Sequence, residues 1–287
     1  MADVLDEIVE TLVAMGIEVE QVHAEASPGQ FEVVTTHGPA LQAADRLLLT
    51  REAVHAVAAK HGLLACFLPK PLPHAPGNGC HLHMSLWEGG INLLGGGEAR
   101  GEAVWEAFFA GVLHYLPALL AVTTPSVNSF ERLKPRCWSG GGYRCWGMDN
   151  KEAPLRGAAP VQPPAASSSS LSLSPWHSAS SVTSAHSPSR FSTGRPTHFE
   201  LKAMDATANP HVAIAAVIAA GLLGVDGAMA LPPPLQTDPA DLSPQQRAAA
   251  GVTPLPGSAA AAAEHVGSPV FLSLSLSQHT HTRTCEM

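Results

Sequence analysis

Acidic and imidazole side chains recur at alternate positions in the first third of the sequence. His81 and His83 are separated by one residue, and so are His23 and Glu25. Because alternate residues of a strand share a face, each pair would point to one side of a sheet. Glu32 follows Glu25 in a second strand-like run. Neighbouring strands with inward Glu and His can build a divalent metal site, and these oxygen and nitrogen ligands suit Mg²⁺ or Mn²⁺ better than a soft metal.

Helical and strand-like patterns alternate along the chain. Apolar residues at helical spacing predict helices over residues 3–15, 40–61, 102–121 and 210–229. Alternating or short apolar runs predict strands over residues 17–24, 31–35, 63–68 and 80–87. This order predicts an α+β domain whose sheet has helices on one face. We expect that sheet to be curved and antiparallel, to carry the metal ligands and to be backed by the last three helices.

Two segments have a composition that does not fit a folded domain. Residues 161–197 contain no Asp, Glu or Lys, and residues 257–287 combine an alanine run with Leu-Ser repeats. Such segments bury too little apolar surface to offset the entropy of ordering. We therefore predict one domain in two parts, 1–160 and 198–256, with a disordered insert and a low-complexity tail. Our hypothesis is that both segments are translated non-coding sequence or a faulty gene model, the alternative being a genuine disordered insert.

The composition also limits the classes of partner and compartment. A formal net charge of −8 disfavours nucleic acid and acidic membranes. Five cysteines without CxxC spacing indicate a reducing compartment, where Cys66 and Cys80 are expected to be small buried thiols. The longest apolar run, 212–225, is shorter than the roughly 20 residues that span a bilayer. With no signal-peptide pattern at the start, we expect a cytoplasmic protein without membrane or nucleic-acid partners, or a plastid protein if the true N-terminus is missing.

Five blocks of sequence, taken together, resemble the catalytic domain of glutamine synthetase. They follow one another in the order typical of that family: HAEASPGQFE at 23–32, FLPKP at 67–71 with GNGCHLHMS at 77–85, NSFERLKP at 128–135, NKEAPLR at 150–156, and HFELKAMD at 198–205 with ANPH at 208–211. The short segments Trp138-Ser139-Gly140 and Cys145-Trp146-Gly147 are similar to those of the glutamine-synthetase-like branch of plant nodulins and fungal developmental regulators.

The resemblance implies site roles for residues in each block. It implies that one metal ion is held by Glu25 and Glu32, and a second by His81 and Glu200. The residues implied in substrate binding are Gly77, Arg132 and Lys202. The residues implied in nucleotide binding are His83, Ser85, Lys151 and Arg156. Arg132 and Arg156 are the implied catalytic residues, since phosphoryl transfer needs cations on the transferred group.

The chemistry implied by the resemblance joins glutamate and ammonia through γ-glutamyl phosphate. It uses ATP with Mg²⁺ or Mn²⁺, and the family's sites form between the subunits of a homo-oligomer. Two alternatives stay open. One is an ATP-dependent γ-glutamyl ligase that uses another amine or acid, and the other is an inactive domain that regulates or oligomerises.

The chain also departs from the family pattern. By resemblance, it begins after the N-terminal β-domain and after a Glu-x-Glu strand that supplies further metal ligands. No acid follows Pro135, where the family has a flap glutamate, and Lys202 stands where most members have arginine. We therefore predict weak or no ligase activity for the isolated chain.

Overall fold

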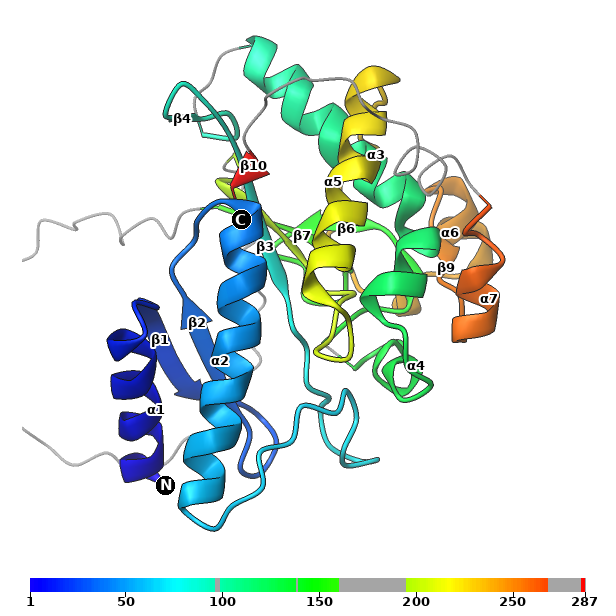
Figure 1. Cartoon of the computed structure of the whole chain (residues 1–287). Helices are drawn as coiled ribbons and strands as arrows, with labels where there is room; N and C mark the ends of the chain where they lie inside the picture. The colour runs from blue at the N-terminus through cyan, green and yellow to red at the C-terminus, as the bar shows by residue number, and fades with distance from the viewer. Residues whose placement is uncertain (96–98, 138, 160–194, 268–284, 287) are drawn as a thin grey trace, which may run out of the picture.

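The computed structural model of the chain describes residues 1–95, 99–137, 139–159, 195–267 and 285–286. Nearly all of the predicted insert, 161–197, lies outside these described residues, and so does most of the predicted tail. The order of elements begins with a helix, a hairpin and a second helix, and continues with a larger sheet and two long helices (Figure 1).

The N-terminal part of the chain forms a small unit with its own core. It consists of α1 (Ala2–Ala14), β1 (Val19–Ala24), β2 (Phe31–Thr35) and α2 (Ala40–Lys60). The two strands form an antiparallel, two-stranded sheet. Apolar residues at helical spacing on α1 pack against α2, and the buried members of this core are Val4, Ile8, Leu12, Ile17, Ala53 and Val57. Val4, Ile8 and Leu12 are four residues apart, so they share one face of α1, and this apolar face packs against α2.

A six-stranded sheet lies beside this unit. The strand order is β10-β3-β8-β7-β6, with β4 paired to β3. The strands are β3 (Leu82–Glu88), β4 (Ile91–Asn92), β6 (Trp146–Met148), β7 (Leu155–Ala158), β8 (His198–Leu201) and β10 (Cys285–Glu286). All described pairings are antiparallel except β6–β7, which is parallel.

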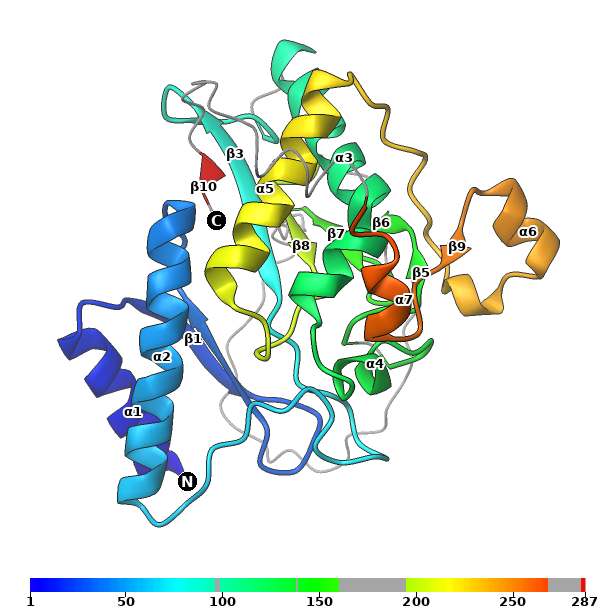
Figure 2. The same cartoon turned by 45° about the vertical axis from the view of Figure 1, so that its right-hand side comes forward.

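Two long helices cover the apolar face of this sheet. They are α3 (Ala99–Thr123) and α5 (Pro210–Asp226), and they lie side by side in Figures 1 and 2. Gly111 of α3 and Gly224 of α5 allow this close approach, because a Cβ on Gly111 would lie 2.2 Å from a backbone oxygen of α5. Phe199 of β8 stacks on Phe109 of α3 with ring centroids 4.0 Å apart, which joins the sheet to the helices.

The shorter elements are α4 (Ser129–Arg132), β5 (Tyr143–Arg144), η1 (Pro239–Asp241), α6 (Pro244–Ala249), β9 (Thr253–Pro254) and α7 (Ala259–Ala263). Of these, α4 and α7 lie near the lower end of α3 and α6 lies further out (Figure 2). The helix α7 falls within the predicted low-complexity tail. Ser258 caps it and Ala262 is buried in the main core, so the alanine run is a packed helix.

The predicted α+β class is confirmed, and two details of the prediction are wrong. Residues 63–68 form no strand, because this apolar run is largely exposed, with Leu64 91% accessible. The larger sheet is mixed rather than antiparallel, and β1–β2 is a separate sheet. The strands that carry the predicted ligands therefore come from two sheets, and both the metal ligands and the curvature stay predictions.

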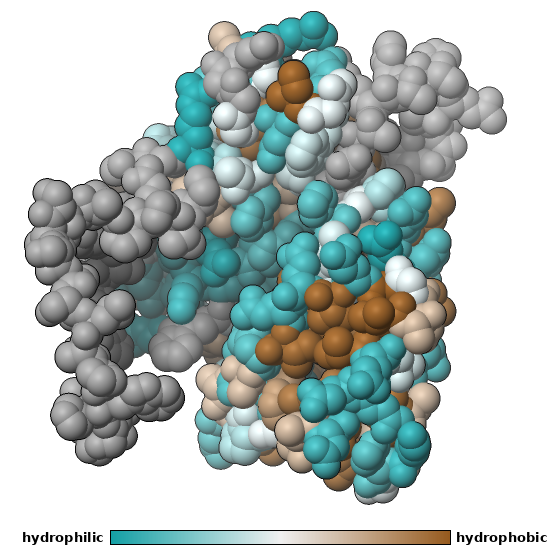
Figure 3. Space-filling model, turned by 90° about the vertical axis from the view of Figure 1, so that its left-hand side faces the viewer, coloured by the Kyte–Doolittle hydropathy of each residue, from teal (hydrophilic) through white to brown (hydrophobic). Residues whose placement is uncertain are grey.

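One helix of the described residues, α3, is long and apolar enough to cross a membrane by length and composition. This helix is longer than the apolar run at 212–225, which is too short to cross a bilayer. Of the apolar window of α3, 67% is buried inside the protein, as in the core helix of a globular domain. Exposed apolar surface gathers elsewhere, on the face that carries α1 (Figure 3).

Candidate active site

The register of three neighbouring strands aligns a row of polar side chains on one face of the larger sheet. His83 of β3 lies opposite Glu200 of β8, and Glu200 lies opposite Arg156 of β7. In the next row, Met84, Phe199 and Gly157 point to the buried face under α3 and α5. Alternation along each strand thus separates a polar face from an apolar core.

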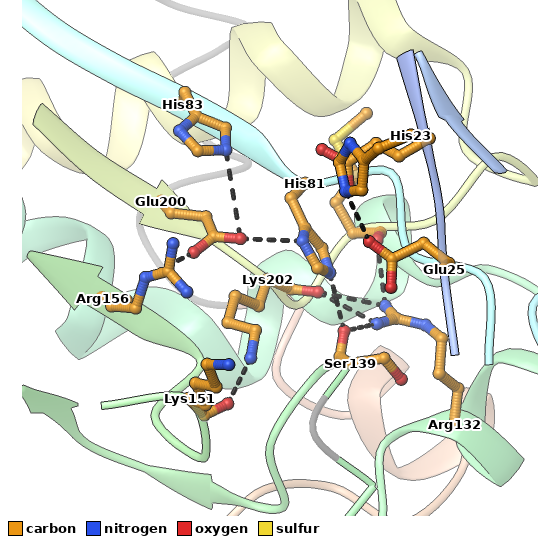
Figure 4. Close-up of polar contacts among 12 residues, drawn as sticks. His23, Glu25, His81, His83, Arg132, Ser139, Lys151, Arg156, Glu200 and Lys202 are labelled. Carbon is orange, nitrogen blue, oxygen red and sulfur yellow. Dashed lines mark hydrogen bonds and ion pairs between the residues drawn. The ribbon is translucent and has the colours of Figure 1, made fainter. Parts of the chain in front are cut away.

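Glu200 is the centre of this polar row (Figure 4). Its Oε1 lies 2.7 Å from His81 Nδ1 and 4.0 Å from His83 Nε2, and its Oε2 lies 2.8 Å from Arg156 Nε. The side chain is only 4% exposed. Burial alone would raise the pKa of the Glu200 carboxyl, but the hydrogen bond from His81 and the charges of His81 and Arg156 lower it to about 2. Glu200 is therefore a buried carboxylate held among three nitrogen-bearing side chains.

Two histidines lie on one side of Glu200. His83 and His198 have ring centroids 5.1 Å apart. Burial lowers the pKa of His83 to about 4 and lowers that of His198, although the charge of Glu200 acts in the opposite direction. Both imidazoles are therefore neutral near pH 7, with ring nitrogens that can accept a hydrogen bond or bind a metal.

A second polar cluster lies on the β1–β2 hairpin. His23 Nε2 lies 3.1 Å from Glu25 Oε1 and 4.0 Å from Glu32 Oε2, and His23 pairs with Glu32 across the hairpin. One ligand atom from each of the three residues lies within 4.8 Å of the others. Burial, a hydrogen bond with Glu25 and the charge of Glu25 raise the pKa of the Glu32 carboxyl. Two carboxylates this close repel each other, and a bound cation would relieve the repulsion.

The residues at both clusters fit divalent metal ions. Each cluster offers imidazole nitrogen and carboxylate oxygen, a set that suits Mg²⁺ or Mn²⁺. The charge of His81 also acts on Glu32, so the two clusters are electrostatically connected. Figure 4 shows His23 and Glu25 on the other side of His81 from Glu200.

Arg132 lies beneath the site and is fully buried. Its guanidinium donates to the main-chain oxygens of Ser139, Lys202 and Met204, the last at 2.9 Å. Burial lowers the pKa of Arg132 to about 10. Gly77 packs directly on it, because a Cβ at this position would lie 2.6 Å from Arg132 Cγ.

Lys202 and Lys151 come together at the lower edge of the site. Lys202 Nζ donates to the Lys151 carbonyl oxygen, and burial lowers the pKa of Lys202 to about 8. The Lys151 side chain is exposed. Ser85 lies two residues after His83 on β3, and its Oγ accepts a hydrogen bond from Trp87 Nε1 at 2.9 Å. The two lysines thus belong to one edge of the site, and Ser85 lies further along β3.

The family follows from a comparison of the whole chain. A family model described as "Glutamine synthetase, catalytic domain" matches residues 1–168 and 182–286. The chain belongs to the glutamine synthetase family. The family consists of ATP-dependent carbon–nitrogen ligases, and the 13 residues between the two matched ranges lie within the predicted insert.

Individual relatives within the family carry different names. The gamma-glutamylpolyamine synthetase GlnA3 of Streptomyces coelicolor is 40% identical over 89% of this chain and 49% of its own length. The glutamine synthetase of Thermus thermophilus is 32% identical over 96% of this chain and 55% of its own length. The fungal protein fluG of Emericella nidulans is 32% identical over 88% of this chain and 24% of its own length.

A solved structure has the same fold. The structure titled GmaS/ADP complex superposes with a TM-score of 0.73 at 28% identity, covering 93% of this chain and 55% of that chain. This chain therefore spans about half the length of the glutamine synthetases that it matches.

The structure brings most of the predicted site residues together. His81, His83, Arg156 and Glu200 meet at one row, and Glu25 and Glu32 meet on the hairpin. Arg132, which the resemblance implies in substrate binding, contacts main-chain carbonyls in this structure, so its substrate role stays a prediction. Cys66 is exposed, contrary to the expectation of a buried thiol, because the run around it forms no strand.

Three residues that the structure places at the site have no role in the family resemblance. His23, whose spacing from Glu25 indicates a shared strand face, completes the hairpin cluster. His198 is two residues before Glu200, so strand alternation could have placed it on the polar face. Ser139 contributes a main-chain carbonyl, for which the sequence carries no side-chain signal.

Proposed function

We propose that this chain carries an ATP- and metal-dependent site of a γ-glutamyl ligase. The γ-carboxylate of glutamate would take a phosphoryl group from ATP, and an amine would then displace phosphate to form the amide. The supporting observation is the buried carboxylate of Glu200, which forms ion pairs with His81 at 2.7 Å and Arg156 at 2.8 Å and lies next to the hairpin carboxylates. The names of two relatives, a gamma-glutamylpolyamine synthetase and a glutamine synthetase, agree with this chemistry.

The side chains divide the work between metal binding and phosphate binding. His81 and Glu200 would hold one divalent ion, and Glu25 and Glu32, with His23, would hold another. The bound ions would neutralise charge on the phosphates during phosphoryl transfer. Arg156 Nε lies against Glu200 at 2.8 Å, so its guanidinium is held at the same place to bind the transferred phosphoryl group.

The amine is the part of the substrate that the site defines least. Ammonia is the leading candidate, as in glutamine synthetases. A larger amine is the second candidate, because residues 133–137 and 139–142 contain no acid to bind ammonium. The 40% identity to a gamma-glutamylpolyamine synthetase supports this second candidate. A homo-oligomer and a position near the fungal regulator branch are further proposals, the latter supported by the match to fluG.

Hydroxylamine tests the shared first step without a choice of amine, because it traps γ-glutamyl phosphate as a hydroxamate. We expect hydroxamate formation and ADP release that depend on Mg²⁺ or Mn²⁺, ATP and glutamate. The rate should be low, because this chain spans about half the length of the relatives that it matches. His81→Ala and Arg156→Gln should abolish the signal.

The amines are then compared in separate reactions with ammonium and with a diamine such as putrescine. ADP release that depends on neither glutamate nor metal would overturn the ligase proposal. ATP binding without any hydroxamate would favour the alternative of an inactive domain that regulates or oligomerises.

A further inference from the structure

One main-chain oxygen contacts both His81 and the buried Arg132. The carbonyl oxygen of Ser139 accepts from His81 Nε2 at 2.9 Å and also from Arg132 Nη1. Figure 4 shows Ser139 below His81 and beside the Arg132 guanidinium. Glu200 holds the opposite ring nitrogen, His81 Nδ1, at 2.7 Å.

The chemistry of a carbonyl fixes which nitrogen of His81 carries the proton in this contact. A carbonyl oxygen can only accept, so Nε2 must be the donor. Nδ1 faces the Glu200 carboxylate and donates to it, and a bound metal ion would take the place of the Nδ1 proton. Metal-binding histidines commonly donate the other ring N–H to such an acceptor, which fixes the tautomer and the ring orientation.

We propose that the Ser139 carbonyl is a positioning group, which holds His81 with Nδ1 directed at the metal and ties this orientation to Arg132. The proposal rests on the metal-dependent function proposed above. It assigns a role to the Ser139 backbone and no role to its side chain. Within the described part of the chain, the buried Ser139 Oγ has no hydrogen-bond partner.

The backbone around Ser139 is held in place on both sides. The Ser139 N–H donates to the Cys137 carbonyl at 2.6 Å. Gly140 lies so close to Arg132 that an added Cβ would be 2.9 Å from Nη1 and 2.5 Å from Leu133 Cδ2. A side chain at Gly140 would therefore force Arg132, Leu133 or the backbone next to Ser139 to move.

Two substitutions at neighbouring positions separate the carbonyl from the side chain. Gly140→Ala crowds Arg132 and the backbone that carries the Ser139 carbonyl, whereas Ser139→Ala keeps the carbonyl and removes only the hydroxyl. Mn²⁺ affinity is measured by calorimetry on the whole chain. We expect Gly140→Ala to weaken Mn²⁺ binding by about 10-fold or more, the usual cost of losing an outer-shell partner, and Ser139→Ala to bind like the wild type.

The tautomer of His81 is measured directly by ¹⁵N-histidine NMR. The His81 signals are assigned by their absence from His81→Gln, and spectra are recorded without metal and with Mg²⁺. We expect a protonated Nε2 in both states of the wild type. This measurement needs no catalysis, so it tests the positioning role even if the ligase proposal fails, and it decides the matter if Gly140→Ala does not fold.

Three results would overturn the proposal. They are an Nε2 without a proton in the wild type, a folded Gly140→Ala with wild-type Mn²⁺ affinity, and a loss of affinity in Ser139→Ala equal to that in Gly140→Ala.

Discussion

The two metal-type clusters of this protein are built in different ways. The cluster around Glu200 lies across three strands of a six-stranded sheet, and its central carboxylate is 4% exposed. The cluster of His23, Glu25 and Glu32 lies on a two-stranded hairpin, where the side chains are 38–44% exposed. The first is neutralised by His81 and Arg156, whereas the second brings two carboxylates together with one imidazole.

Folding alone pairs the charges of the Glu200 cluster, whereas it leaves two carboxylates together on the hairpin, where we propose that a cation binds. Removal of charge should therefore have opposite effects at the two clusters. At Glu200 it leaves Arg156 and His81 without their counter-charge, and on the hairpin it relieves repulsion between carboxylates.

Glu200→Gln should have the largest effect on stability. We expect the free energy of unfolding to fall by about 3 kcal/mol, because partly buried Arg156 and His81 lose their carboxylate. Denaturant unfolding without metal measures this change. Glu25→Gln is the matched control and should change stability by less than about 0.5 kcal/mol. Equal losses in the two variants would show that the clusters do not differ.

Acid should weaken the Glu200 cluster within a defined pH window. The folded pKa of Glu200 is about 2 and the ordinary value is 4.5, so its contribution is fully present above pH 4.5 and is lost as the pH falls towards 2. This contribution is about 3 kcal/mol. Urea unfolding at a series of pH values measures the slope, which should be smaller in Glu200→Gln. A slope identical to that of the wild type would contradict this account.

Mn²⁺ should stabilise the protein through the hairpin. At 100 times its dissociation constant, a ligand that binds only the folded state adds about 2.7 kcal/mol. Thermal unfolding with and without Mn²⁺ measures the gain. Glu32→Gln should lose much of it while keeping wild-type stability without metal. If Mn²⁺ stabilised Glu32→Gln as much as the wild type, the hairpin would not bind the metal.

Gln30→Ala should have a smaller effect on stability than Glu200→Gln. Gln30 Nε2 donates to the Gly77 carbonyl at 3.1 Å and to Asn78 Oδ1 at 2.6 Å, which joins the hairpin to the segment before His81. Loss of these bonds should cost about 1 kcal/mol and weaken Mn²⁺ binding several-fold. Calorimetry on this variant, with Gln21→Ala on the exposed β1 as control, checks the prediction. Equal behaviour of the two variants would show that the hairpin binds metal without this connection.

The sequence was informative where chemistry is local. Strand alternation predicted that His81 and His83 share a face, and Leu82 and Met84 are buried on the other face as expected. The pairing of His83 with Glu200 joins residues more than 100 positions apart, so only the family resemblance could suggest it. Spacing alone cannot specify such a register.

The failures of the sequence analysis have physical causes. The apolar run 63–68 predicts a strand, but in the described structure these residues are largely exposed and pair with no other strand. The alanine run at 259–263 has a tail-like composition, yet its small side chains allow α7 to pack closely on the core. The contact of the Ser139 carbonyl depends on the backbone path, which residue types do not reveal.

Calorimetry of ATP binding tests the central claim most directly. Binding is measured with and without Mg²⁺, on the wild type and on His81→Ala. The account predicts that ATP binds the wild type only with Mg²⁺ and that His81→Ala loses this binding. ATP binding that needs neither Mg²⁺ nor His81, or no binding by the wild type, would contradict the claim that the two clusters form a metal-dependent nucleotide site.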